Sequence, residues 1–243
     1  MIELVGLTKK YGDFAAVKGL DLSVDPGEIF GFIGPNGAGK TTTLKMMGGL
    51  LAPTAGTVTI DGVRMDLDPV SAKRRIGFIP DRPYLYEKLT GTEFLRFTAK
   101  LYGVDGDAFD ARAEEKLELF GLSDWPNELI EAYSHGMKQR LIMSAALLHD
   151  PRVIIVDEPT VGLDPAATKM LKDLFSGLAE SGITIFMSTH TLQVAEEICD
   201  RIGVINRGEL IATGSVGELK HQAQVADETL EAVFLKLTAA ALF

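Results

Sequence analysis

A glycine-rich segment that follows a short apolar stretch restricts the possible folds of this chain more than any other feature. Residues 34–41 read Gly-Pro-Asn-Gly-Ala-Gly-Lys-Thr and fit the pattern G-x-x-x-x-G-K-[ST]. We expect a buried strand over residues 29–33 before this segment and a helix over residues 41–50 after it. In that setting glycines let successive backbone N–H groups point inward at phosphates, and the helix N-terminus adds its dipole. An ordinary tight turn would not explain the lysine and the threonine, so the segment predicts a phosphate-binding loop.

The residue types in this loop have distinct expected tasks. Lys40 supplies a positive charge to the phosphates, and the hydroxyl of Thr41 is a suitable Mg²⁺ ligand. The residues expected to contact the bound nucleotide in this segment are Gly34, Pro35, Asn36, Gly37, Ala38, Gly39, Lys40, Thr41 and Thr42.

A second candidate feature is an apolar strand that ends in two carboxylates. Residues 153–158 read Val-Ile-Ile-Val-Asp-Glu. In a parallel sheet such a strand is buried on both faces, and its carboxyl end opens at the nucleotide crevice. Asp157 is then expected to hold Mg²⁺, directly or through water. Glu158 is expected to polarise the attacking water as general base, a role worth about 10²–10⁴ in rate. Carboxylates at a strand end can also be merely solvated, but a nearby phosphate loop favours the functional interpretation.

Strand-like and helix-like segments alternate along most of the chain, which indicates an α/β fold. Between residues 90 and 148 apolar residues recur at helical spacing, as at Phe94, Phe97 and Leu101, which predicts a helical block inserted into the core. The alternation elsewhere predicts a largely parallel sheet with ligand sites at the carboxyl ends of its strands. The expected strands cover residues 2–5, 14–17, 20–24, 29–33, 58–60, 76–79, 153–156, 183–187 and 202–205, and further helices cover residues 166–179, 192–200 and 228–237.

Composition argues against some functions and locations. The formal net charge is −10, whereas a protein that neutralises nucleic-acid phosphates usually carries a basic face, so no nucleic-acid partner is expected. The clearly apolar stretches fall far short of the roughly 20 residues of a membrane span, and the chain does not open with a secretion signal. The single cysteine, Cys199, excludes an internal disulfide and is interpreted as inert core filling. We therefore expect a cytoplasmic protein.

The segment between these two sites carries a family resemblance. Residues 133–140, Tyr-Ser-His-Gly-Met-Lys-Gln-Arg, resemble the signature sequence of the ATP-binding subunits of ABC transporters. Ser134 is suited to cap the following helix and leave N–H groups free for an anion. The resemblance implies that Ser134 and Gly136 reach across to the ATP held by a partner subunit. A cap that serves only its own helix is the alternative.

Three further segments match the same family. Residues 160–164, Thr-Val-Gly-Leu-Asp, resemble its D-loop, which implies that Asp164 lies near ATP and the partner subunit. His190 ends the segment Ser-Thr-His and resembles the switch histidine, which contacts the γ-phosphate and takes part in catalysis. Tyr11 stands where the family places an aromatic residue that stacks on adenine, although aromatic core packing is the alternative.

The resemblance extends over nearly the whole chain and implies its organisation. It implies a RecA-like, phosphate-loop ATPase core with an N-terminal antiparallel β subdomain over residues 1–89 and 149–215. A helical subdomain over residues 90–148 and a helical tail over residues 216–243 complete the expected chain. The implied cofactors are ATP and Mg²⁺. The implied partners are a second copy or a homologous ATPase subunit, which forms a dimer around two ATP, and integral membrane permease subunits on the inner face of the cell membrane.

Two positions depart from the family pattern. Asp81 stands where the family has a glutamine that ligates Mg²⁺ and senses the permease, and no glutamine precedes Gln139. An aspartate offers Mg²⁺ a hard oxygen but adds a negative charge beside Glu158. We therefore expect slower hydrolysis or a steeper Mg²⁺ dependence than a glutamine would give. In the signature, His135 replaces a glycine and Met137 replaces a glutamine.

Short segments indicate which system the chain serves. Residues 79–87 and 229–235 are most similar to the prokaryotic exporter-type, ABC-2-like branch. An importer ATPase, or an ABC ATPase for cofactor assembly without a membrane partner, are the alternatives. DNA-repair and ribosome-bound relatives contain long coiled coils or two ATPase domains, which this sequence lacks. A small GTPase or kinase would leave the signature, the D-loop and His190 unexplained.

Overall fold

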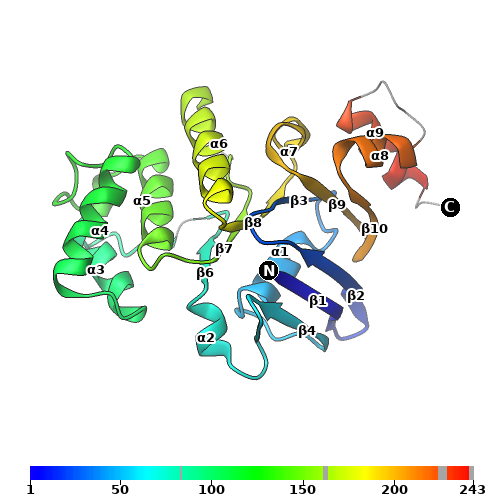
Figure 1. The fold of residues 1–243 in the computed structure, drawn as a ribbon, viewed down its shortest axis with the longest axis horizontal. Coiled ribbons are helices and arrows are strands. Elements are labelled where there is room, and N and C mark those ends of the chain that lie inside the picture. Colours follow the sequence, from blue (N-terminus) through cyan, green and yellow to red (C-terminus); the bar gives the residue numbers. More distant parts are fainter. Residues whose placement is uncertain (83, 161–163, 224–228, 241–243) are drawn as a thin grey trace.

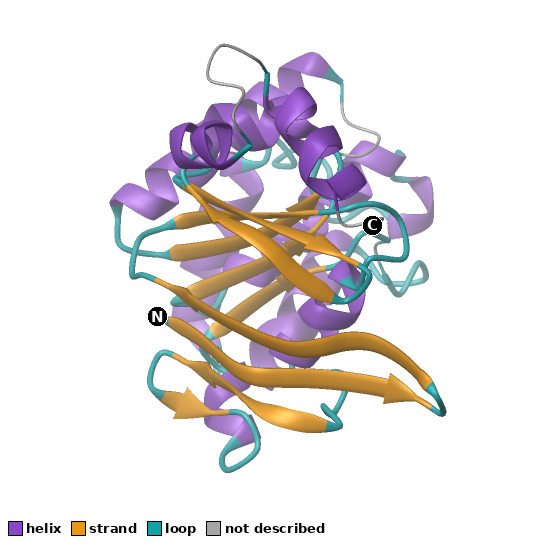
Figure 2. Cartoon of the chain, turned by 90° about the vertical axis from the view of Figure 1, so that its right-hand side faces the viewer, coloured by secondary structure: helices purple, strands orange, loops and turns teal. Residues whose placement is uncertain are grey.

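The structure, a computed structural model, describes residues 1–82, 84–160, 164–223 and 229–240. In these ranges the strands form a larger and a smaller sheet, and a group of helices lies beyond one edge of the larger sheet (Figure 1). The two sheets face each other with the phosphate-loop helix between them, which contacts strands of both (Figure 2).

The larger sheet has the strand order β10-β9-β3-β8-β7-β6. Strand β10 is antiparallel to β9, and the other neighbours are parallel. Every residue of β3 and β7 is buried, because both faces of the sheet are covered. The strands are β3 (Ile29–Ile33), β6 (Ile76–Ile79), β7 (Val153–Asp157), β8 (Thr184–Thr189), β9 (Arg201–Asn206) and β10 (Glu209–Gly214).

The register of this sheet sets the position of the candidate site. Ile33 pairs with Thr189, and Asp157 pairs with Ser188. The carboxyl ends of β3, β7 and β8 therefore lie side by side, so the segments that follow them converge. Helices α1 (Lys40–Met47), α6 (Pro165–Glu180) and α7 (Leu192–Ile198) begin at this edge, and the short α2 (Pro69–Lys73) precedes β6.

The smaller sheet is antiparallel and has the order β2-β1-β4-β5. Its strands are β1 (Ile2–Tyr11), β2 (Phe14–Val24), β4 (Ala55–Ile60) and β5 (Val63–Arg64). Alternate residues of β1 are buried, so one face packs inward and the other faces solvent. The inward face shares a hydrophobic cluster with Phe30, Phe32 and Phe186 of the larger sheet, which fixes β1 and β2 beside the phosphate loop.

The helical group comprises α3 (Gly91–Leu101), α4 (Gly106–Leu119), the 3₁₀ turn η1 (Ile130–Ala132) and α5 (His135–Leu147). A capping box between Thr90 and Glu93 starts α3. The group is attached to the sheet through His149, whose Nε2 lies 3.0 Å from the carbonyl oxygen of Ile76, and whose ring stacks on Tyr102. The chain ends with α8 (Val216–Gln222) and α9 (Leu230–Ala240), which pack near α7 (Figure 1). Among the described residues, none of the helices is long and apolar enough to cross a membrane.

The α/β fold class expected from the sequence is confirmed. Several boundaries differ. The phosphate-loop helix spans Lys40–Met47 rather than residues 41–50, and α7 ends at Ile198. The two strands expected over residues 14–17 and 20–24 form one strand, because Gly19 at φ 61° allows a bulge within it. Elements β5, α2 and β10 were not expected, since each is short or lies at a sheet edge and lacks a strong pattern.

Candidate nucleotide-binding site

The phosphate loop connects the buried strand β3 to α1. Gly39 occupies the N-cap of α1 at φ 113°, and no side chain caps this helix end. A Cβ atom at Gly39 would lie 2.6 Å from the carbonyl oxygen of Ala16, and one at Gly34 would collide with the carbonyl oxygen of Ile205. Glycine is therefore required at both positions, by backbone conformation at Gly39 and by close packing at both.

Lys40 is folded back onto the loop that precedes it. Its ammonium group donates hydrogen bonds to the carbonyl oxygens of Gly34, at 2.6 Å, and Pro35, at 3.3 Å. Burial lowers the pKa of Lys40, whereas the nearby carboxylates of Glu158 and Asp157 act to raise it. A buried ammonium inside a curled loop is suited to attract the phosphates of a nucleotide.

Asp157 connects the phosphate loop to two strands of the sheet. Its Oδ2 accepts a hydrogen bond from the hydroxyl of Thr41 at 2.9 Å, and its Oδ1 accepts one from the hydroxyl of Ser188. The side chain is almost fully buried, which fixes its orientation. The sequence marks Ser188 only as the start of the Ser-Thr-His segment that ends in His190. The contact between Ser188 and Asp157 was therefore not predicted.

The donor set at Thr41 and Asp157 fits Mg²⁺. Both groups supply hard oxygen ligands. Across the described residues, no group of three or more His, Cys, Asp or Glu side chains could hold a metal ion. One carboxylate and one hydroxyl suit a cation that takes its remaining ligands from nucleotide phosphates and water, as Mg²⁺ usually does.

Glu158 and His190 lie in contact across the ends of β7 and β8. His190 Nδ1 lies 2.7 Å from Glu158 Oε2, and the backbone N–H of His190 donates to the same oxygen at 3.2 Å. Glu158 has the left-handed backbone φ of 52°, which is unfavourable for a residue with a Cβ atom. Its N–H is held by the carbonyl oxygen of Ser188 at 3.0 Å. The Glu158 side chain is 14% exposed and that of His190 is 59% exposed, so the carboxylate is mostly covered whereas the imidazole is open to solvent.

A hollow of about 430 Å³ brings together residues that are far apart in the sequence. Tyr11 and Phe14 line it next to Asp81 and Glu158. Tyr11 is 51% exposed and Phe14 is 65% exposed, so both rings are available to a flat ligand rather than packed in the core. Phe14 pairs with Tyr11 across the β1–β2 turn, and no local motif marks it. The full lining is Tyr11, Phe14, Ala16, Asn36, Gly37, Ala38, Gly39, Lys40, Thr41, Thr42, Asp81 and Glu158.

Ser134, Gly136 and Asp164 line a separate hollow of about 500 Å³ that shares no residue with the first. The Ser134 hydroxyl accepts the N–H of Met137 at 3.3 Å, and Asp164 Oδ1 accepts the N–H of Ala167 at 2.8 Å. Each therefore caps the helix that follows it. Residues 161–163 of the expected D-loop lie outside the described residues. Arg140, to which no sequence motif gives a role, also lines this hollow and supplies it with a positive charge.

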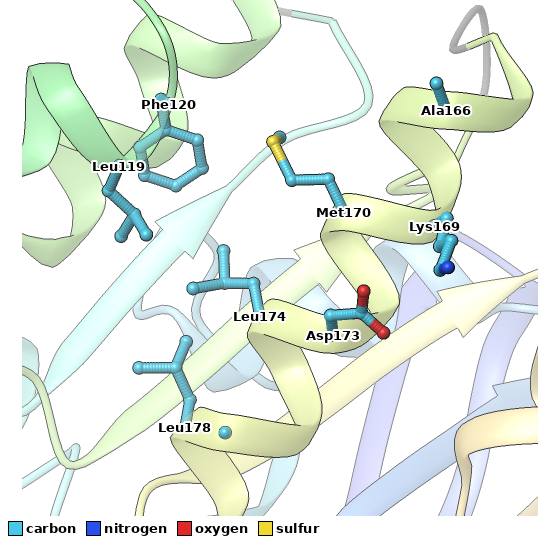
Figure 3. A pocket seen from close by; sticks show the side chains of 9 residues that line it. Leu119, Phe120, Ala166, Lys169, Met170, Asp173, Leu174 and Leu178 are labelled. Carbon is cyan, nitrogen blue, oxygen red and sulfur yellow. The ribbon is translucent and has the colours of Figure 1, made fainter.

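An apolar groove of about 640 Å³ lies between the end of α4 and α6 (Figure 3). Leu119 and Phe120 face Met170, Leu174 and Leu178 across it (Figure 3). None of its lining residues belongs to the phosphate loop, so the groove is distinct from the nucleotide hollow.

Comparison with known proteins agrees with this geometry. The sequence profile described as "ABC transporter" matches residues 17–161. The linearmycin resistance ATP-binding protein LnrL of Bacillus subtilis is 40% identical over 219 residues, which cover 90% of this chain and 70% of LnrL. The probable multidrug ABC transporter ATP-binding protein YbhF of Escherichia coli is 39% identical over 240 residues, which cover 98% of this chain but 41% of YbhF.

Solved structures match over most of the chain. An ATP-binding subunit of an ABC transporter has a TM-score of 0.92 and 33% identity, with 98% of this chain and 99% of that chain covered. A dimeric ATP-binding cassette, bound to ADP and Pi in a post-hydrolysis state, has a TM-score of 0.81 and 31% identity, with 89% and 99% covered. The chain therefore belongs to the ABC transporter family and is the ATP-binding and ATP-hydrolysing subunit of such a transporter.

Proposed function

We propose that this chain powers the export of drug-like or antibiotic compounds through separate membrane permeases. The observation that supports ATP-driven work most directly is the convergence of Lys40, Thr41, Asp157 and Glu158 at one edge of the sheet. The direction of transport rests on relatives, since LnrL is named for linearmycin resistance and YbhF as a probable multidrug transporter.

In this proposal each residue of the phosphate-loop edge has a defined task. Lys40 would turn from the loop carbonyls to neutralise phosphate charge. Thr41 and Asp157 would hold Mg²⁺, which would supply electrostatic stabilisation of the transferred phosphoryl group. Glu158 orients and polarises the attacking water as general base. His190 contacts Glu158 through its backbone N–H and its Nδ1, and in this proposal it also contacts the terminal phosphate. Tyr11 and Phe14 offer aromatic faces to adenine.

The separation of the two hollows supports a two-subunit site. Ser134 and Gly136 do not share a hollow with the phosphate loop of their own chain, so they would serve ATP bound to a second copy or a homologous subunit. Arg140 would add positive charge there. The dimeric cassette among the structural relatives is consistent with this arrangement.

An exposed aromatic patch offers a contact for the permease. The segment that begins at Asp81 in the nucleotide hollow leads to Tyr84 and Tyr86, whose side chains are exposed. The ring of Tyr86 packs edge-on against that of Phe97 on α3, with centroids 5.4 Å apart. A permease that touches this patch would be joined to Asp81 by a few residues of backbone. We propose that the working chain binds its permease at the inner face of the cell membrane.

The test combines ATP hydrolysis with oligomeric state. The wild-type chain should hydrolyse ATP only with Mg²⁺. Glu158→Gln should lower kcat by about 10²–10⁴ while ATP stays bound, because the substitution keeps the shape and removes the base. Light scattering should then show a dimer with Mg-ATP and a monomer without it. A variant that hydrolyses ATP at the wild-type rate would contradict the role of Glu158.

Export has its own measurement. Cells whose chromosomal copy carries Glu158→Gln should retain more of an amphipathic dye such as ethidium than wild-type cells. Lower dye content in the variant cells would indicate import instead.

A further inference from the structure

The C-terminal helix α9 reaches the proposed catalytic residues. A cavity of about 240 Å³ is lined by Gly34, Pro35, Asn36, His190, Leu192 and Phe234. Five of these residues belong to the phosphate loop or to the segment around His190, and Phe234 comes from α9. Phe234 also packs against an apolar cluster beside the site, and none of the roles proposed above uses it.

Helix α9 is firmly attached to the elements that flank the site. Leu230 and Val233 are fully buried in a cluster that also contains Ile33, the last residue of β3 before the phosphate loop. Leu192, the first residue of α7 and the second after His190, packs against the same cluster. One apolar cluster therefore supports both the start of the phosphate loop and the helix that follows His190.

Polar contacts fix the position of α9 along its axis. Glu196 on α7 accepts the backbone N–H of Leu230 at 3.4 Å through one oxygen and the ammonium of Lys220 on α8 at 3.0 Å through the other. Near the other end, the side-chain amide of Asn206 donates to the carbonyl oxygen of Thr238 at 3.5 Å. These contacts bracket Phe234, so its ring is presented to the cavity by a fixed helix.

The orientation of the His190 imidazole is weakly restrained by its own contacts. Its imidazole is largely exposed, and its polar contact in the described structure is with the carboxylate of Glu158. A ring with that much freedom loses catalytic geometry easily, since a displacement of about 1 Å can lower a rate by about 10²-fold. Phe234 forms part of the wall of the cavity that the imidazole also lines, so a smaller side chain at this position would enlarge the space into which the ring can turn.

We propose that Phe234 is a positioning residue for ATP hydrolysis, which acts by restricting His190 beside the phosphate loop. This inference rests on the proposed function of His190. In the full-length chain, Phe234→Ala should lower kcat about tenfold and leave KM for ATP within about twofold, because nucleotide contacts remain while His190 is released. Leu235→Ala is the matched control, since Leu235 is the next residue on the helix and is 59% exposed. It should behave as the wild type, and Phe234→Leu should recover most of kcat.

A double-mutant cycle identifies the route of the effect. If Phe234 acts through His190, Phe234→Ala should add little to the loss that His190→Ala already causes. Losses that multiply would overturn the proposal. So would a fall in kcat that parallels a fall in Tm and is not recovered by Phe234→Leu, because those results describe a merely structural contact.

A spectroscopic readout separates this inference from the proposed function. In the nucleotide-free chain with ¹³C-labelled histidine, the His190 ring signal, assigned with His190→Asn, should move in Phe234→Ala and stay unchanged in Leu235→Ala. An unmoved signal would overturn the positioning role whatever the activity. If the His190 signal moves in Phe234→Ala but the wild-type chain hydrolyses no ATP, the proposed function is refuted. The influence of Phe234 on the His190 ring would still be established.

Discussion

Asp81 provides the sharpest test of how charge controls this nucleotide site. It lines the same hollow as Glu158 and Lys40, so two negative side chains face one positive side chain there, before any phosphate enters. Two like charges about 6 Å apart repel by about 3 kcal/mol at an effective dielectric constant of 20, and by about 0.7 kcal/mol in water. Asp81 is exposed, which places its effect between these limits, at about 1–2 kcal/mol or roughly 5- to 30-fold in rate or binding.

The perturbation is Asp81→Gln, measured by steady-state ATP hydrolysis as a function of free Mg²⁺. A bound divalent cation offsets much of the repulsion, so the variant should exceed the wild type most at low Mg²⁺ and least at saturation. At low Mg²⁺ the rate of the variant should exceed that of the wild type by the same roughly 5- to 30-fold factor. Wild-type hydrolysis should be the more steeply dependent on Mg²⁺.

Asp81→Asn is the matched control for side-chain length. Asparagine keeps the size of aspartate and removes only its charge, so it should reproduce most of the shift if charge is the cause. If only Asp81→Gln shifts the curve, the missing carbon of the shorter side chain is the cause and the electrostatic argument fails. Superimposable Mg²⁺ titrations for all three proteins would refute any role for Asp81 in metal or nucleotide binding.

Three further outcomes follow from single contacts. Thr41→Ala removes the hydroxyl that donates to Asp157, and it should lower Mg²⁺-dependent ATPase activity at least about tenfold while fluorescent ATP still binds without metal. Gly39→Ala forces a Cβ against the Ala16 carbonyl at a left-handed φ, and it should weaken nucleotide binding and lower the free energy of unfolding by about 1–3 kcal/mol in a urea titration; unchanged stability would contradict the packing argument. Burial raises the pKa of Cys199 to about 12, so at pH 8 almost no thiolate forms and a thiol reagent should react far more slowly than with unfolded chain; equal rates would show that the thiol is accessible.

Local sequence patterns predicted the parts of this molecule that depend on near neighbours in the chain. The phosphate loop requires glycine at fixed spacings because of backbone angles and close packing, so its pattern is visible in a single segment. The apolar run that ends in Asp157 likewise marks a buried strand without any knowledge of its partners. The α/β class follows from the same local alternation.

Contacts between distant segments left no such pattern. Phe14 lines the nucleotide hollow because a tight turn places it opposite Tyr11, and any large residue could follow that turn. Ser188 meets Asp157 because β7 and β8 are paired in one particular register. Phe234 lines a cavity together with the phosphate loop because α9 docks on α7. Each is a consequence of tertiary packing, which periodicity and motif spacing do not encode.

The contacts around Glu158 explain why its strained backbone conformation persists. An extended backbone there would continue β7 and carry the side chain along the strand, whereas the left-handed conformation turns the chain at the sheet edge. The carbonyl oxygen of Ser188 on β8 accepts a hydrogen bond from the Glu158 N–H, and the N–H of His190, the residue that follows β8, donates to the Glu158 carboxylate. A residue in this conformation costs about 1–3 kcal/mol and persists only when its surroundings determine it. The end of β8 thus stabilises the strained backbone of Glu158, and His190, the next residue, orients its carboxylate, which couples the proposed general base to the position of His190.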